Sequence, residues 1–181
     1  MGNTTARWLS AQVDESDPEA LSLLGMIYLR AAVAAARHQD RPTAADLLNR
    51  AELLADDLGS DENYWQTGFG PTNVLLHRLS IELDLDNVSY VVEHGRIDVD
   101  HMPQERSVSH RIDYARALSM AGQGDEAFGE LRTAERTSPQ LVRNNPRVRE
   151  TLRDLVKQSP VSGGSRSSEV FVMAQRCRAV Q

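Results

Sequence analysis

The sequence has few aromatic residues and a single cysteine. Phe, Trp and Tyr make up 5% of its 181 residues, which is fewer than a β-sandwich or a β-barrel usually contains. Cys177 is the only cysteine, so an internal disulfide and a cysteine-based zinc site are both excluded, as suits a reducing compartment. No apolar run reaches the roughly 18 residues of a membrane span, and the N-terminus lacks the pattern of a secretory signal. We therefore expect a cytoplasmic protein that does not insert into a membrane.

Sequence motifs of catalysis are also missing. There is no glycine-rich phosphate loop after a strand, no G-x-S-x-G, and no H-E-x-x-H spacing among the histidines, which stand at positions 38, 77, 94, 101 and 110. His94 and His101, with Asp98 and Asp100, could form a metal site, but a short polar segment of this kind is more often solvated. We expect no enzyme activity, no cofactor and no metal.

Charge is distributed unevenly along the chain. Residues 1–130 carry 10 basic and 22 acidic side chains, and residues 131–181 carry 10 basic and 4 acidic ones, which gives net charges of -12 and +6. The acidic body should repel nucleic acid. The basic end is either a contact with phosphate or an intramolecular or subunit contact with the acidic body, and the pattern favours the second interpretation.

Apolar periodicity and helix-breaking residues predict an all-α chain. Asp17 and Pro18 are a typical helix start, and Gly59 is a typical helix end. Residues 59–71 interrupt the pattern with a glycine-containing loop that holds Tyr64, Trp65 and Phe69. The helices predicted in this way cover about residues 5–13, 18–37, 42–58, 71–85, 86–94, 103–121, 125–137, 144–157 and 170–180.

The segment QGDEAFGELRTAERTSP, over residues 123–139, resembles the end of a tetratricopeptide repeat. Ala127 stands where the two helices of a repeat hairpin touch, Leu131 and Ala134 follow at the positions that face the next hairpin, and Pro139 ends the second helix. This resemblance implies a right-handed solenoid of about three antiparallel helical hairpins with flanking helices. The expected organisation is a repeat domain over residues 1–158, a linker over 159–169, and a C-terminal helix or mobile tail over 170–181.

Four segments extend this resemblance to a family of regulators. FGPTNVLLHRLSIELDL, HRIDYARAL, GDEAFGELRTAE and NPRVRETLRDLV look like the C-terminal domains of actinobacterial-type Xre-family transcriptional regulators. In that family a helix-turn-helix domain precedes a tetratricopeptide-like domain that senses a signal or mediates assembly. Only the short helix over residues 5–13 precedes the repeats here, so we expect no direct binding of nucleic acid by this chain.

A repeat domain of this kind implies a binding groove, lined by the first helix of each hairpin. Side chains on those helices, together with aromatic residues of the 59–71 loop, are the candidate ligand contacts. Several also have a structural alternative: a helix-start hydrogen bond for Asn73, a core histidine bonded across the hairpin interface for His77, packing for Tyr114, and a plug between hairpins for the aromatic loop. The candidate residues are Tyr28, Arg30, Trp65, Phe69, Asn73, His77, Arg111 and Tyr114.

The resulting hypothesis is a module that senses a peptide or a small signal for a transcriptional regulator. The alternative is a constitutive scaffold that binds a protein partner without a small ligand. A homodimer is compatible with either hypothesis.

Overall fold

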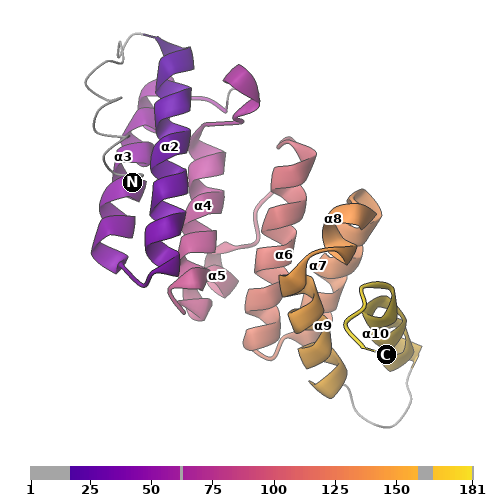
Figure 1. Ribbon diagram of the computed structural model, residues 1–181. Helices are drawn as coiled ribbons and strands as arrows, with labels where there is room; N and C mark the ends of the chain where they lie inside the picture. The colour runs from indigo at the N-terminus through magenta and orange to yellow at the C-terminus, as the bar shows by residue number, and fades with distance from the viewer. Residues whose placement is uncertain (1–16, 62, 159–164, 181) are drawn as a thin grey trace. The chain divides into compact units, whose positions relative to one another are not determined.

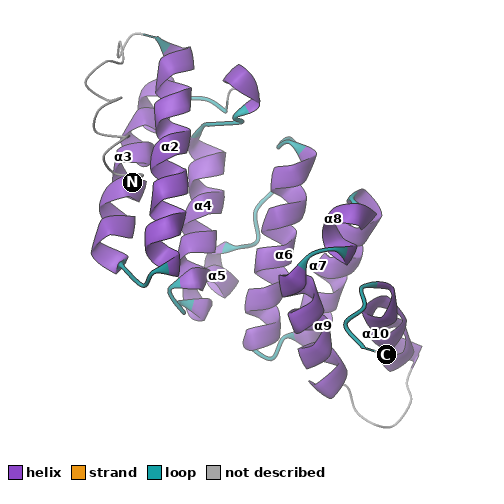
Figure 2. Ribbon diagram, in the orientation of Figure 1, coloured by secondary structure: helices purple, strands orange, loops and turns teal. Residues whose placement is uncertain are grey.

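Every regular element is helical in the part of the chain that the computed structural model describes, which comprises residues 17–61, 63–158 and 165–180 (Figure 2). The predicted all-α class is thereby confirmed for these residues, and the helix predicted over residues 5–13 lies outside them. The chain divides into two compact units between Asn87 and Val88, inside the range that was expected to form one domain.

Unit 1 is built from three long helices, α2 (Pro18–Arg37), α3 (Arg41–Leu58) and α4 (Pro71–Asp84), with a short 3-10 turn, η1 (Tyr64–Gln66). Asp17 accepts a hydrogen bond from the Glu19 amide at 2.9 Å, and Pro18 follows as the first helical residue. Gly59 ends α3 in the left-handed conformation, with φ of 68°. α2, α3 and α4 pack against one another in every pair (Figure 1).

The core of unit 1 depends on a close approach between α2 and the loop before α4. A Cβ atom added at Gly25 would lie 2.0 Å from Cζ of Phe69, whose ring is fully buried. Glycine therefore lets the ring sit directly on the α2 backbone. Leu29, Ala32 and Leu47 continue this core between the helices.

α2 also has the length and the apolar composition of a membrane-crossing helix, which corrects the expectation that no segment does. The charged side chains of α2 stand near its two ends and at Arg30, so a stretch of 18 residues within the helix is apolar enough to cross a membrane. Half of this stretch is buried inside the fold. The core helix of a folded domain has the same composition, and α2 packs against α3 and α4 in this way.

Unit 2 has a helical hairpin at its centre, with four shorter helices packed around it. The hairpin consists of α6 (Gln104–Met120) and α7 (Gly124–Thr137). The flanking helices are α5 (Val88–His94), α8 (Pro139–Arg143), α9 (Pro146–Gln158) and α10 (Ser165–Arg176). α4 and α5 follow each other in the sequence but belong to different units.

Several helices end with the same backbone motif. A residue with positive φ follows the last turn. Its own amide and that of the next residue donate to carbonyls of that turn, which satisfies backbone acceptors that would otherwise lack partners. At the end of α4, Asp86 has φ of 63° and Asn87 N–H donates to Glu82 O at 2.8 Å. Asp86 therefore belongs to the end of α4, whereas the sequence pattern had assigned it to the start of α5. The residues with positive φ in this motif are Gln39, Asp86, Gly122 and Arg178.

α10 begins at Ser165, within the range predicted as a linker, and it packs against α9. Its apolar stripe is Val170, Met173 and Ala174, and Cys177 continues it beyond the last turn; all four are buried. The described part of residues 170–181 is thus helical as far as Arg176 and packs against α9.

Candidate functional site

The predicted site residues of unit 1 are mostly interior. Tyr28 is buried, and the guanidinium carbon of Arg50 lies 5.9 Å from the centre of its ring. Phe69 is fully buried against Gly25. Only Arg30 and Trp65 are exposed, Trp65 with 68% of its surface free.

Asn73 and His77 lie together inside unit 1. The Nδ1 atom of His77 is 2.8 Å from the carbonyl oxygen of Asn73, and because a carbonyl can only accept, this nitrogen carries the proton. The amide nitrogen of Asn73 is 3.5 Å from both Met26 Sδ and Thr67 O, while its buried Oδ1 has no hydrogen-bond partner among the residues that the structure describes. Both side chains are buried, but the N-cap of α4 has no side-chain hydrogen bond, and the bond of His77 to Asn73 lies within α4. A role in binding stays a prediction.

The aromatic residues of the loop around η1 were expected either to contact a ligand or to plug the space between hairpins, and the structure places them differently. Phe69 is the plug between helices, whereas Trp65 projects into solvent from a left-handed backbone, with φ of 53°. Hydrogen bonds within the loop hold this conformation: Asn63 Oδ1 accepts from Gly68 N–H at 2.9 Å, and Thr67 Oγ1 donates to Tyr64 O at 2.7 Å.

The two predicted site residues of unit 2 also have partners within the chain. Arg111 forms ion pairs with Glu130 at 2.8 Å and Asp100 at 3.3 Å. Tyr114 is buried against Gly95, where an added Cβ would lie 2.4 Å from the tyrosine ring. The eight candidates are therefore divided between the units, six in unit 1 and two in unit 2.

Beside Tyr114 lies a buried histidine that the sequence analysis did not select. The ring of His110 is parallel to that of Tyr114, with centres 6.0 Å apart, and its Nε2 donates to Gly95 O at 3.0 Å. Burial lowers the pKa of His110, since this effect exceeds the opposing influence of the Gly95 hydrogen bond and of the nearby Asp113 and Glu130 carboxylates. The ring is therefore neutral in the folded protein at neutral pH.

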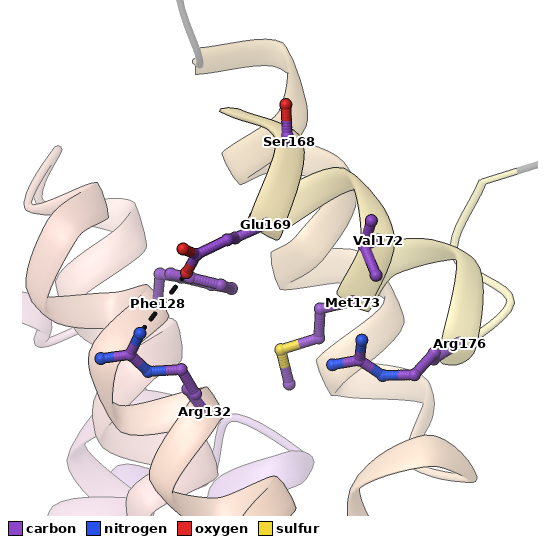
Figure 3. A pocket seen from close by; sticks show the side chains of 7 residues that line it. All are labelled: Phe128, Arg132, Ser168, Glu169, Val172, Met173 and Arg176. Atoms are coloured by element: carbon purple, nitrogen blue, oxygen red, sulfur yellow. Dashed lines mark hydrogen bonds and ion pairs between the residues drawn. The ribbon is translucent and has the colours of Figure 1, made fainter. Parts of the chain in front are cut away.

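A cleft lies between α7 and α10 in unit 2. Its volume is about 390 Å³, within the range of roughly 300–1,000 Å³ that is common for ligand sites. Figure 3 shows α7 and α10 contributing opposite walls. The lining residues are Phe128, Arg132, Ser168, Glu169, Val172, Met173 and Arg176.

The floor of the cleft is apolar and its rim is charged. Phe128 and Met173 are buried, with 5% and 1% of their surfaces exposed, and Val172 is 47% exposed at the edge. Phe128 and Arg132 stand one turn apart on α7, so they share a face, and the guanidinium carbon lies 6.0 Å from the centre of the ring. Arg132 Nη1 reaches Glu169 Oε2 across the cleft at 3.4 Å (Figure 3).

A buried carboxylate fixes the end of the α10 wall. Arg176 donates to both oxygens of Glu135, from Nε at 3.0 Å and from Nη2 at 2.6 Å, and Arg143 Nε donates at 2.9 Å. The hydrogen bond from Arg176 lowers the pKa of Glu135, although burial acts in the opposite direction. The adjacent Cys177 thiol is fully buried, and burial raises its pKa. α10 is thereby tied to α7 and α8 as well as packed on α9.

These contacts account for much of the basic C-terminal charge. Arg143 and Arg176 pair with Glu135, Arg132 with Glu169, and Arg147 with Asp113 at 3.0 Å. Arg147 contacts the acidic body, as that interpretation expects, whereas Arg132, Arg143 and Arg176 pair with acidic residues of the same C-terminal quarter. The cleft itself was missed because it joins helices that are distant in sequence; the basic, amphipathic C-terminus was a visible signal of it.

The described lining of the cleft combines charged, polar and apolar groups. It offers two guanidinium groups, one carboxylate, one exposed hydroxyl and an apolar floor, and no imidazole or thiol that could serve as a base or nucleophile. No group of three or more His, Cys, Asp or Glu side chains within the described ranges could hold a metal ion. His94 instead donates from Nδ1 to Tyr90 O at 2.9 Å, and Asp100 pairs with Arg111. Comparisons with models of protein families, with curated proteins and with solved structures give no significant match.

Proposed function

We propose that this chain is a tetratricopeptide-like binding module of a transcriptional regulator, and that it takes a peptide or a small signal in the α7–α10 cleft. The observation that carries the proposal is the cleft itself, whose apolar floor and charged rim are built on the hairpin with the strongest repeat signature. The resemblance to the sensor domains of Xre-family regulators supports the regulatory part.

The repeat assignment is supported by an equivalence between the two hairpins. Residues of α3 and α7 whose numbers differ by 83 (127 less 44) occupy the same positions relative to the preceding turn. At the turn itself, Gln39 and Gly122 both have positive φ, of 58° and 78°. The buried pairs are Ala44 with Ala127, Leu48 with Leu131, and Ala51 with Ala134.

Binding without catalysis follows from the chemistry of the lining. Ligand sites commonly combine an apolar pocket with a few charged groups that orient the ligand, and the cleft has this composition. The proposal includes neither a cofactor nor direct contact with nucleic acid, and it places the module in the cytoplasm.

The test is native mass spectrometry of the purified chain after incubation with a fractionated extract of its source cells. The proposal expects a bound mass of peptide or metabolite size. Val172→Glu should prevent this binding, because it places a charge at the mouth of the cleft, and Leu53→Glu should not. Leu53 is a matched control, since it is 65% exposed and lies on α3 of unit 1.

Two results would count against the proposal. A ligand that still binds the Val172→Glu variant but no longer binds the Leu53→Glu variant would indicate a site in unit 1. A chain that captures only an intact protein, with no small ligand, would favour the scaffold alternative.

A further inference from the structure

The two arginines of the α7–α10 cleft are held very differently. Arg176 makes a two-point contact with Glu135, whose side chain is 9% exposed. Arg132 makes one contact of 3.4 Å with Glu169, and the two side chains are 55% and 53% exposed. Its Nε and Nη2 make no hydrogen bond to the residues that the structure describes. Arg132 is therefore the arginine of the cleft whose carboxylate partner a ligand can replace.

The contact that Arg132 makes is weak for its type. A guanidinium binds a carboxylate best through two parallel N–H groups, and a single long contact between exposed side chains contributes little. An incoming carboxylate that presents both oxygens would therefore replace Glu169 at small cost.

The position of Arg132 over Phe128 defines what such a ligand must look like. A carboxylate on this guanidinium lies beside the buried Phe128 ring and above Met173, so an apolar group attached next to it would fall on the cleft floor. The α-carboxylate and the side chain of a C-terminal amino acid have this arrangement. The cleft is also open at the exposed side chains of Ser168 and Val172, where a peptide chain can leave.

We infer that the cleft recognises the C-terminal residue of a peptide, with its carboxylate on Arg132 in place of Glu169 and an aliphatic or aromatic side chain on the floor formed by Phe128 and Met173. This inference rests on the proposed function and specifies its ligand.

The test uses N-acetylated Ala-Ala-Leu and Ala-Ala-Phe, each with a free and with an amidated C-terminus. Binding is followed by the amide chemical shifts of α7 and α10 as each peptide is titrated into the whole chain. The free acids should bind at least about tenfold more tightly than the amides, as expected for hydrogen bonds to a charged group. Free leucine, without the preceding residues, should bind more weakly than the tripeptide.

Substitutions of Arg132 and of Glu169 should change the affinity for the free acid in opposite directions. Arg132→Gln should remove the preference for the free acid, and Glu169→Gln should increase affinity for it about threefold or more, because a competing carboxylate is lost. Arg136→Gln is the matched control: it lies one turn along α7 and binds Thr133 Oγ1 at 3.2 Å, so it should leave the preference unchanged.

Equal binding of acid and amide in the cleft would overturn the carboxylate inference while leaving the proposed binding function intact. Weaker binding in Glu169→Gln would overturn it as well, because Glu169 would then assist the ligand. If no peptide binds, the inference fails, and the proposed function is judged separately by the extract experiment. If free leucine binds as tightly as the tripeptide, a small acid and not a peptide end is the ligand.

Discussion

Gly25 and Phe69 should show strong energetic coupling, because one has no side chain where the other places its ring. In Gly25→Ala the new methyl carbon would lie 2.0 Å from Phe69 Cζ, whereas carbon atoms in contact are about 3.5–4.0 Å apart. The ring is fully buried, so it cannot rotate into solvent to make room. The methyl group must therefore displace the core of unit 1.

The size of the effect follows from two opposing contributions. Overpacking costs about 1–3 kcal/mol, and alanine in place of a mid-helix glycine returns about 1 kcal/mol. Phe69→Ala alone should cost about 3–5 kcal/mol through the cavity that it leaves. In that background the methyl group has space, so Gly25→Ala should stabilise the chain by about 1 kcal/mol. The coupling between the two sites is then equal to the overpacking cost, about 1–3 kcal/mol.

This coupling is measured as a double-mutant cycle, with the unsubstituted chain, Gly25→Ala, Phe69→Ala and the double variant. Each is unfolded in urea, and unfolding is followed by far-UV circular dichroism. Gly129→Ala in α7 is the control, because nothing lies within 4 Å of its added Cβ; it should stabilise the chain by about 1 kcal/mol whether or not Phe69 is present. Changes at Gly25 and Phe69 that add to within about 0.5 kcal/mol would refute this account of the core.

Three further predictions test unit 2 and the exposed loop. Glu135→Gln should speed alkylation of the buried Cys177 thiol about tenfold, because α10 opens more often when its arginine contacts weaken; an unchanged rate would mean that the apolar stripe alone holds the helix. Burial lowers the pKa of His110 below 6.5, so the unfolded chain takes up a proton first as the pH falls, and stability should decline below about pH 6.5. His110→Gln should flatten this decline, which is measured as the urea midpoint of unfolding at a series of pH values. A midpoint that falls as steeply in the variant would mean that another group causes the decline. Trp65→Gly should raise stability by up to about 1 kcal/mol, since glycine relieves the positive φ, and a loss would show that the indole packs on the fold.

Local signals in the sequence predicted the helices well. The starts at Pro18 and Pro71 and the end at Gly59 were found to the residue, because each depends on the conformational limits of a single residue and its cap. α8 was missed because Pro139 both follows the end of α7 and starts a short helix. A helix of five residues carries too little periodicity to be recognised.

Features that depend on distant contacts could not be predicted in this way. The aromatic residues of the 59–71 loop looked alike in sequence, yet Phe69 is buried and Trp65 is exposed, because only Phe69 meets a glycine on another helix. The α7–α10 cleft likewise depends on Glu135 pairing with Arg176, 41 residues away. A carboxylate within an apolar helix face was the hint that a distant cation would cover it.

Hydrogen exchange of the whole chain, with and without the ligand captured from the extract, tests most directly whether the α7–α10 cleft is the binding site. The account predicts slower exchange in α7 and α10 when the ligand is bound, and no change in α2 and α3. Protection confined to α2, α3 and α4 would contradict it, and would return the site to the groove residues that the sequence first indicated.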